Sequence, residues 1–478
     1  MAIQHSKLGF ISPEFTPASN LDAIREALFR KGVVFISGCD DEAVAELSKQ
    51  LGRVAQAHSD VDNGTTVTTT KGVEGHEYDR EELFFHTSGN SYEVPPRLLI
   101  NALDIQSPTS GETLLADGHQ IAEFLRTHEP ALYDLFTSPK YSGPLYDTHT
   151  GVIRLSLDDS TKLSPGLAER LPELKKIISD HAFAFTLAPG QGYIIDNWRF
   201  LEGPSNLPRE RKAHRVLTFP HVRPLLIDID GTLCRAGKTS LKAWFRCINK
   251  VLNRSEGDSN YITFENTMIP IDGKTHLSFL HAILLRHGIP ESEIPSLTQE
   301  FFALQPKILK ETFEEPGADP CYICTGVPEM LVWFGELKKR AATVDIQIGL
   351  LTGNSQVNAL TKLRASTLDT SLFDLDISAF GDVQAKRVNL VHDAIRKLEV
   401  KYGIEGIVAP KNVTLVGDTP LDVECAKLAG CKILAVTTGV YKAEQLREVH
   451  LDGGVFVPDL VAAKMEDAKS WFEEVIAL

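Results

Sequence analysis

The sequence predicts a multidomain protein in which a β-rich N-terminal half precedes an α/β half with a doubly wound parallel sheet. A length of 478 residues suggests more than one domain, since domains average about 150 residues. Two textures meet near residue 222: short apolar stretches between turn residues before it, and apolar runs alternating with amphipathic patterns after it. Strands that alternate with helices are typical of a parallel sheet.

Each predicted element follows from the local pattern of apolar residues. In the first half, strand-like stretches occupy residues 32–38, 97–103 and 192–197. In the second half, compact apolar runs predict buried parallel strands at Leu225–Ile229, Ile346–Leu351, Val413–Val416 and Ile433–Val436. Helical periodicity covers Val388–Leu398 and Leu421–Ala429, and Gly430 is suited to end the second of these helices.

Composition and charge exclude several classes of protein. Hydrophobic residues make up 43% of the chain and charged residues 24%, which excludes disordered, collagen-like and coiled-coil chains. A net charge of −15 disfavours nucleic acids and anionic membranes as partners. No apolar run approaches the roughly 18 residues of a membrane span. Seven scattered cysteines suggest reduced thiols, so we expect a cytoplasmic protein.

Acidic residues follow the first strand of the α/β half. The segment LLIDIDGTL, residues 225–233, places Asp228 and Asp230 at the carboxyl end of an apolar strand. Ligands of open α/β sheets bind outside the carboxyl ends of the strands, and paired carboxylates there suit a divalent cation and covalent phosphoryl chemistry. Later segments add phosphate donors, a cation and further carboxylates, in this order: Thr352, Gly353 and Asn354, then Lys386 or Arg387, then Asp418 and Asp422.

As an ordered set, the motifs DxDGT, TGN, K/R and GDxxxD resemble the haloacid dehalogenase (HAD) superfamily over residues 224–478. The resemblance implies that Asp228 is a nucleophile that forms an aspartyl-phosphate and that Asp230 is the general acid and base. It also implies a Mg²⁺ ion held by Asp228, the backbone carbonyl of Asp230 and Asp418, with Asp422 in support.

The same resemblance implies that Thr352 and one of two adjacent cations neutralise the phosphoryl oxygens. The family usually has lysine at this position, whereas phosphoglycolate-phosphatase-like members can use arginine. Lys386 and Arg387 therefore both stay candidates, and Arg387 is preferred. Dehalogenases lack a counterpart of Asp230 because no alkoxide leaves in their reaction, so this residue favours hydrolysis of a small phosphate monoester.

A long helix-patterned segment between the first two motifs resembles the inserted α-helical cap of HAD phosphatases, at about residues 234–343. Gly273, Lys274 and Thr275 stand where related phosphatases carry a substrate-binding loop. A solvated loop at a helix N-terminus explains the same three residues equally well. Phosphonate cleavage through a Schiff base on Lys274 is an alternative reaction.

The N-terminal half carries a second set of motifs at residues 84–118 and 189–219, among them PPR, SGETLLADG and a late R-x-x-x-R segment. Over about residues 8–220 they resemble the taurine-dioxygenase-like branch of Fe(II)/2-oxoglutarate oxygenases, whose fold is a double-stranded β-helix, or jelly roll. The two resemblances imply an oxygenase-like jelly-roll domain at residues 1–222 and a HAD hydrolase domain at residues 223–478.

Oxygenases of this branch bind iron through two histidines and one carboxylate, in the pattern His-x-Asp followed by a distant His-Gly. Here His86 keeps the first position, Ser88 replaces the carboxylate, and Glu202 replaces the second histidine. His86 and Glu202 are therefore the candidate iron ligands. The resemblance implies that 2-oxoglutarate binds at Thr113, Arg211 and Arg215, the last of which also faces the primary substrate.

The altered ligands leave three roles open for this half: an oxygenase with a rearranged iron centre, a jelly roll that binds an anion without oxidation, or a scaffold. The expected protein is a Mg²⁺-dependent phosphatase fused to an oxygenase-like domain. It is either bifunctional on one biosynthetic pathway or a phosphatase with an inactive jelly roll. A non-hydrolytic, phosphate-responsive regulator is the competing class, and the sequence leaves the substrate and the oligomeric state open.

Overall fold

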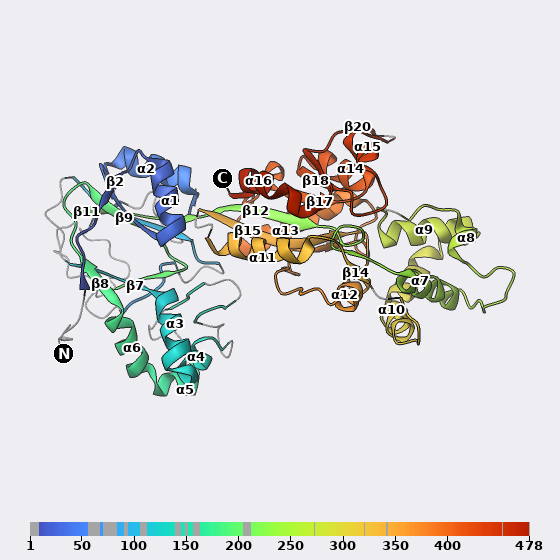
Figure 1. Ribbon diagram of the computed structural model, residues 1–478, viewed down its shortest axis with the longest axis horizontal. Helices are drawn as coiled ribbons and strands as arrows, with labels where there is room; N and C mark the ends of the chain where they lie inside the picture. The colour runs from blue at the N-terminus through green and yellow to red at the C-terminus, as the bar shows by residue number, and fades with distance from the viewer. Residues whose placement is uncertain are drawn as a thin grey trace. The chain divides into compact units, whose positions relative to one another are not determined.

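The computed structural model describes residues 9–55, 67–69, 84–89, 94–105, 112–138, 145–148, 152–155, 163–203, 212–271, 273–319, 321–340, 343–451 and 453–477. The chain divides into two compact units, Met1–His221 with Lys339–Asp345 and Val222–Lys338 with Ile346–Leu478 (Figure 1). Within the described ranges, every helix is too short or too polar to cross a lipid bilayer.

The described residues of the N-terminal unit form two β-sheets. The first has the order β1-β8-β7-β10, formed by Gly9–Phe10, Ala182–Phe185, Thr113–Asp117 and Phe200–Glu202. The second has the order β2-β3-β9-β6-β11-β4, formed by Phe15–Pro17, Val33–Ser37, Gln191–Asp196, Leu98–Leu103, Lys212–Phe219 and Arg53–Val54, with β5 (Val67–Thr69) also paired to β11. Its helices are α1 (Leu21–Lys31), α2 (Asp41–Leu51), α3 (Gly118–His128), α4 (Pro130–Phe136), α5 (Pro165–Glu169) and α6 (Leu171–Asp180).

Strand β6 shows how the apolar pattern builds this unit. Its side chains alternate between the two faces of the sheet because successive residues of a strand point in opposite directions. Leu98 and Ile100 pack in one core cluster with the apolar residues of α1 and α2, whereas Leu99 and Leu103 join a second cluster with residues of the other sheet. Asn101 therefore lies on the face that is turned toward the second cluster.

The C-terminal unit is built on a parallel sheet with the order β16-β15-β12-β17-β18-β21. These strands are Ala379–Phe380, Val344–Thr352, His221–Ile227, Thr414–Gly417, Lys432–Val436 and Leu460–Ala462. The helices of this unit that follow or precede the strands are α11 (Val327–Arg340), α12 (Gln356–Ala365), α13 (Arg387–Tyr402), α14 (Pro420–Leu428), α15 (Ala443–Arg447) and α16 (Lys469–Phe472). The predicted alternation of strands and helices is confirmed, and Gly430, with φ of 73°, follows the end of α14.

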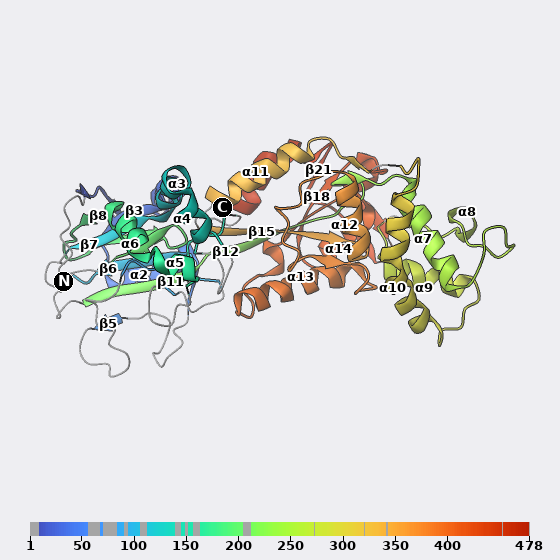
Figure 2. The ribbon, with the colours of Figure 1, turned by 90° about the horizontal axis from the view of Figure 1, so that it is seen from below.

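Within the described residues, four helices are inserted between β13 and β14: α7 (Lys238–Val251), α8 (Phe264–Thr267), α9 (His276–Arg286) and α10 (Ile294–Phe313). Figure 2 shows them grouped beyond one end of the parallel sheet. They have a core of their own around Trp244, Phe279 and Phe301. The chain enters and leaves this insertion through the short antiparallel pair β13 (Cys234–Arg235) and β14 (Tyr322–Ile323).

Candidate active site

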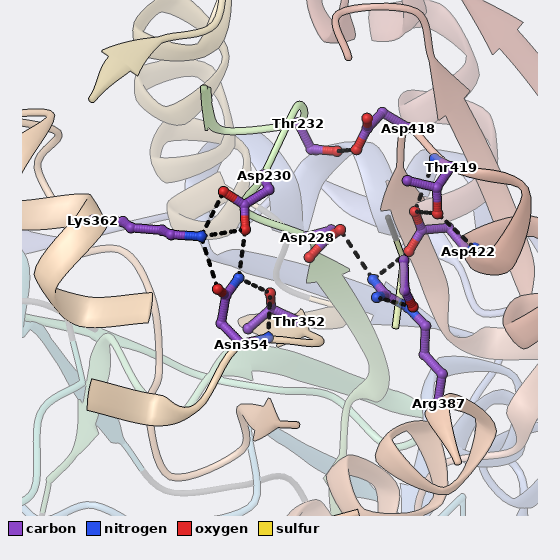
Figure 3. Close-up of polar contacts among 11 residues, drawn as sticks. Asp228, Asp230, Thr232, Thr352, Asn354, Lys362, Arg387, Asp418, Thr419 and Asp422 are labelled. Atoms are coloured by element: carbon purple, nitrogen blue, oxygen red, sulfur yellow. Dashed lines mark hydrogen bonds and ion pairs between the residues drawn. The ribbon is translucent and has the colours of Figure 1, made fainter. Parts of the chain in front are cut away.

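Three neighbouring parallel strands place the candidate residues at one edge of the sheet (Figure 3). Asp228 follows β12, Thr352 ends β15, and Asp418 follows β17. Because β12 lies between β15 and β17, their carboxyl ends meet at one place. This is the edge at which open α/β sheets bind ligands.

Three buried carboxylates meet at this edge. One carboxylate oxygen from each of Asp228, Asp418 and Asp422 lies within 4.8 Å of the other two. Burial and the neighbouring carboxylates of Asp422 and Asp228 raise the pKa of Asp418 to about 9. Among the described residues, Asp228 Oδ1 is buried without a hydrogen-bond partner. A divalent hard cation would offset this crowding of negative charge and occupy the unpaired oxygen, so the residues fit Mg²⁺.

Two glycines make the space that Asp418 occupies. A Cβ atom on Gly231 would lie 2.2 Å from Asp418 Oδ2, and one on Gly439 would lie 1.7 Å from the same oxygen. Gly231 also has φ of 79°, a left-handed conformation that favours glycine. The Thr232 hydroxyl donates to Asp418 Oδ1 at 3.1 Å and fixes the other side of the carboxylate.

Arg387, the first residue of α13, supplies the cation of the site. Its Nη2 lies 3.0 Å from Asp228 Oδ2 and also donates to Asp422, while its Nη1 donates to the carbonyl oxygen of Gly273 at 3.0 Å. Burial would lower the pKa of this guanidinium, but Asp422 and Asp228 outweigh that effect and raise it. Burial also raises the pKa of Asp228 to about 6, against the opposing charge of Arg387. Lys386, the other candidate cation, precedes α13 by one position and has an exposed side chain. The structure therefore favours Arg387 over Lys386 as the cation of the site.

Asp230 is held by a second cation that the sequence analysis did not name. Lys362 Nζ lies 2.8 Å from Asp230 Oδ1 and 2.7 Å from Oδ2, and Asn354 Nδ2 donates to Oδ2 at 2.7 Å. Burial would raise the pKa of Asp230, but Lys362 and Asn354 outweigh it and lower the pKa. The carboxylate of Asp230 is thus engaged by Lys362 instead of joining the cluster of three carboxylates.

Helical spacing gives a partial signal for Lys362. Asn354, Asn358 and Lys362 are four residues apart, which places them on one face of α12 and the turn before it. The structure joins them: Lys362 Nζ donates to Asn354 Oδ1 at 2.8 Å, and Asn358 Nδ2 donates to the same oxygen at 2.9 Å. A polar row on a buried helix face indicates a functional or structural network rather than solvent contact.

The TGN segment is folded on itself at the end of β15. The Thr352 hydroxyl oxygen accepts from Asn354 N at 3.3 Å and from Asn354 Nδ2 at 2.8 Å. Gly353 passes so close to the loop before α9 that a Cβ atom there would lie 2.1 Å from the carbonyl oxygen of Lys274. The expected phosphate donors Thr352, Gly353 and Asn354 line the same cavity as Asp228, and the Asn354 side chain connects Thr352 to Asp230.

The three residues of the predicted substrate loop have different surroundings. Gly273, with φ of 71°, and Lys274 line the cavity above the carboxylates. Thr275 does not line this cavity: its hydroxyl caps α9 by accepting from Ser278 N at 3.1 Å and donates to the Ala385 carbonyl at 2.9 Å. These contacts favour the alternative explanation for Thr275, a residue at a helix N-terminus, where threonine is a preferred N-cap.

A cavity of about 420 Å³ opens over these residues. Its floor includes Asp228, Asp230, Thr352, Arg387 and Asp418. Side chains from the inserted helices and the loops around them complete the lining, among them Arg235, Lys238, Leu241, Trp244, Lys274 and His276. A cavity of this size accommodates a small metabolite.

The structure brings His86 and Glu202 together but does not offer Glu202 to a metal. The backbones of the two residues pair, with His86 N donating to the Glu202 carbonyl at 2.9 Å and Glu202 N to the His86 carbonyl at 3.0 Å. Both carboxylate oxygens of Glu202 accept from protein donors, and one of these donors is Arg215, whose Nη2 lies 2.7 Å away. Arg215, expected to bind 2-oxoglutarate, pairs with Glu202 instead. The residues at this position therefore do not fit an iron centre.

The remaining 2-oxoglutarate candidates are Thr113 and Arg211. Thr113 begins β7, and its hydroxyl oxygen is buried without a hydrogen-bond partner in the part of the chain that the structure describes. Arg211 lies outside the described residues.

Comparisons with known proteins match the two halves separately. Residues 4–163 match the model of the family described as taurine catabolism dioxygenase TauD, TfdA family, and residues 388–468 match the HAD-hydrolase-like model. Trimethyllysine dioxygenase of Meyerozyma guilliermondii is 26% identical over 165 residues, which cover 28% of this chain and 41% of that protein. The chain thus spans less than half the length of this relative.

Solved structures similar to this chain include HAD-type proteins. A haloacid dehalogenase-like family protein from Streptococcus pneumoniae has 16% identity and a TM-score of 0.34, covering 53% of this chain and 99% of that one. The β-phosphoglucomutase of Clostridium difficile has 16% identity and a TM-score of 0.35, covering 53% and 98%. CbbY of Rhodobacter sphaeroides, in complex with phosphate, has 18% identity and a TM-score of 0.32, covering 52% and 96%. From the family models, the chain carries a TauD/TfdA-type segment in its N-terminal half and a HAD-hydrolase-like segment in its C-terminal half.

Proposed function

We propose that the C-terminal unit is a Mg²⁺-dependent phosphatase that hydrolyses a small phosphate monoester through an aspartyl-phosphate on Asp228. The observation that supports this most directly is the meeting of three buried carboxylates, Asp228, Asp418 and Asp422, with Arg387 beside Asp228. Asp228 and Asp418 would hold Mg²⁺ with support from Asp422, and the ion would supply Lewis-acid stabilisation of the phosphoryl oxygens. The inserted helices would form the cap that closes over the substrate.

In the first step, an Asp228 carboxylate oxygen attacks phosphorus, and the bond from phosphorus to the ester oxygen breaks. Asp230 gives a proton to the departing oxygen, and Arg387 and Thr352 stabilise the phosphoryl oxygens. In the second step, Asp230 takes a proton from the water that attacks the aspartyl-phosphate, and inorganic phosphate leaves with Asp228 restored.

The contacts of Asp230 give Lys362 a role in these two reaction steps. Lys362 and Asn354 lower the pKa of Asp230, so the carboxylate is ionised before substrate binds, which suits its role as base in the second step. Its role as acid in the first step requires a proton. Lys362 Nζ contacts both Asp230 oxygens and so holds this carboxylate in a fixed orientation for the proton transfer.

The test is Mg²⁺-dependent release of phosphate from p-nitrophenyl phosphate and a panel of small phosphate monoesters by the full chain. Asp228→Asn removes the nucleophile and is expected to reduce turnover at least about 1,000-fold. Asp376→Asn is the matched control, because Asp376 is an exposed aspartate of the same unit. Equal turnover in Asp228→Asn and the control would reject the proposal.

Phosphonate cleavage stays a second candidate because Lys274 lines the cavity. A Schiff base to this lysine would be trapped by borohydride as a stable adduct in the presence of a carbonyl-containing phosphonate, and Lys274→Ala would abolish the adduct. Turnover of phosphate esters without any trapped adduct would leave the phosphatase as the one reaction of this site.

For the N-terminal unit, the TauD/TfdA-type match is compatible with two roles. One is oxidation with iron and 2-oxoglutarate, on the same pathway as the phosphatase. The other is ligand binding or support without oxidation. The contacts of Glu202 and Arg215 favour the second role.

A further inference from the structure

We infer that an ion pair between the buried Glu202 and the partly exposed Arg215 takes the place that iron has in TauD/TfdA-type oxygenases, so that charge pairing rather than metal coordination joins this part of the N-terminal unit. The inference goes beyond the proposed phosphatase and does not depend on it. It concerns a position at which one of the three family ligands, His86, is kept and two are replaced.

Three of the four residues that donate to Glu202 lie on three neighbouring strands of one sheet. Asn101 on β6 stands opposite both Tyr193 on β9 and Arg215 on β11 in the strand register. Glu202 lies on β10, in the other sheet of the unit. The cluster thus joins the two sheets at the site where the family places its metal.

Each carboxylate oxygen of Glu202 has two donors. Oε1 accepts from the Tyr193 hydroxyl at 2.7 Å and from Asn101 Nδ2 at 3.2 Å. Oε2 lies 2.7 Å from Arg215 Nη2 and accepts from the Ser88 hydroxyl at 3.3 Å. To bind a metal ion, Glu202 would have to give up at least one of these charge-assisted hydrogen bonds, which are among the stronger polar contacts in proteins.

The negative charge of Glu202 is balanced without a metal ion. The carboxylate of Glu202 and the guanidinium of Arg215 carry opposite charges, and Arg215 Nη2 lies 2.7 Å from Glu202 Oε2. The guanidinium of Arg215 supplies the compensating positive charge. A divalent ion beside Glu202 would lie close to this guanidinium, and two cations at such a distance repel strongly in a buried site.

Ser88 cannot replace the missing carboxylate ligand. Its hydroxyl oxygen accepts from Arg215 Nη2 at 2.5 Å. Asn197 holds its backbone on both sides, with Oδ1 accepting from Ser88 N at 3.0 Å and Nδ2 donating to the Ser88 carbonyl at 2.8 Å. Ser88 is therefore fixed as a neutral partner of Arg215, and a neutral hydroxyl is a weak ligand for Fe(II).

The decisive experiment is anaerobic equilibrium dialysis of the full chain against Fe(II), with iron per chain measured for four proteins. They are the wild type, His86→Ala, the double variant Ser88→Asp/Glu202→His, and this double variant with His86→Ala added. Any iron bound by the carboxylates of the C-terminal unit is common to all four and cancels in the comparison.

We expect the wild type and His86→Ala to hold equal iron, and the double variant to hold about one iron more, which His86→Ala removes. Iron in the wild type that is lost in His86→Ala would overturn the inference. So would a folded double variant without the extra iron, because the ion pair would then not stand at a metal position.

Stability provides a readout that does not require the double variant to fold. Glu202→Gln leaves Arg215 without its counter-charge and is expected to lower the midpoint of thermal unfolding, with or without Fe(II) or a chelator. A midpoint of the wild type that Fe(II) raises, and that Fe(II) does not raise in His86→Ala, would contradict the inference. Phosphate release in the same samples reports on the C-terminal unit, so failure of the phosphatase proposal is seen separately.

Discussion

Lys362 Nζ contacts both carboxylate oxygens of Asp230, at 2.8 and 2.7 Å, and thereby gives this residue surroundings that differ from those of the three clustered carboxylates Asp228, Asp418 and Asp422. Two aspartates two residues apart in the sequence thus have opposite surroundings. Asp228 faces the other carboxylates and Arg387, and burial raises its pKa, whereas the contacts of Asp230 lower its pKa. A nucleophile and a proton carrier are distinguished in this way by their neighbours.

Replacing Lys362 by methionine is expected to lower phosphatase turnover by about 100- to 10,000-fold, the range for impaired acid–base catalysis. Without the ammonium the pKa of Asp230 rises, so the limb of the pH–rate profile that Asp230 controls moves to higher pH. Lys362→Arg keeps the charge and should restore part of the activity. Arg364→Met, at an exposed position of the same helix, is the control. An unshifted pH profile in Lys362→Met would contradict this role.

The two adjacent cations at the start of α13 are expected to respond differently to the same substitution. Arg387→Met leaves Asp228 and Asp422 without their shared partner and should cost about 3–5 kcal/mol of unfolding free energy, together with most of the activity. Lys386→Met alters an exposed side chain and should leave both quantities nearly unchanged. Denaturant unfolding and phosphate release measure the two effects. A loss of activity in Lys386→Met but not in Arg387→Met would show that Lys386, and not Arg387, is the phosphate-binding cation.

Chelation is expected to abolish phosphatase activity, and added Mg²⁺ should restore it. Gly439→Ala introduces a Cβ atom at a point only 1.7 Å from Asp418 Oδ2, so this carboxylate must move. We expect the Mg²⁺ concentration for half-maximal rate to rise at least about tenfold. Gly335→Ala is the matched control, because the nearest atom to its added Cβ lies at 3.8 Å. Equal Mg²⁺ dependence in the two variants would argue against Asp418 as a ligand.

His276 is expected to make the protein less stable in acid. Burial, with help from the charge of Lys362, lowers its pKa from 6.5 to about 3, and its Nδ1 accepts from Ser355 N at 3.2 Å. Between these two pH values the unfolded chain binds a proton that the folded chain does not, so stability falls as pH falls. The contribution is at most ~1.4 kcal/mol per pH unit.

The measurement for His276 is the pH dependence of unfolding free energy from pH 7 down to the acid transition. His276→Gln should show a smaller slope than the wild type, and His281→Gln, at an exposed position of the same helix, should keep the slope of the wild type. A slope that is the same in all three proteins would show that folding does not lower the pKa of His276.

The sequence was informative where a residue's position along a strand determines its place in the site. Asp228, Thr352 and Asp418 each stand at the carboxyl end of an apolar run, and the parallel sheet brings those ends together. Contacts between distant segments were not accessible in this way. The sequence alone indicates Glu202 as a candidate metal ligand. Its partners are known only once strand pairing places Asn101, Tyr193 and Arg215 side by side, and these residues are spread over more than a hundred positions of the chain.

Lys362 shows the same limit from another direction. Its spacing from Asn354 was visible, but an amphipathic helix also places lysines on its solvated face, so the pattern alone does not tell which lysine is buried. Thr275 had two interpretations, and the observed cap on α9 supports the one based on helix termini rather than the one based on substrate.

The makeup of the first compact unit affects how the protein can be divided for study. Besides Met1–His221 it includes the described residues of Lys339–Asp345, and His221 N donates to the Thr343 carbonyl at 3.2 Å. A recombinant fragment that stops at residue 221 would lack a piece encoded more than a hundred codons downstream. Separate expression of the two halves is therefore expected to yield an incomplete first half, and co-expression or an inserted short strand would be needed to complete it.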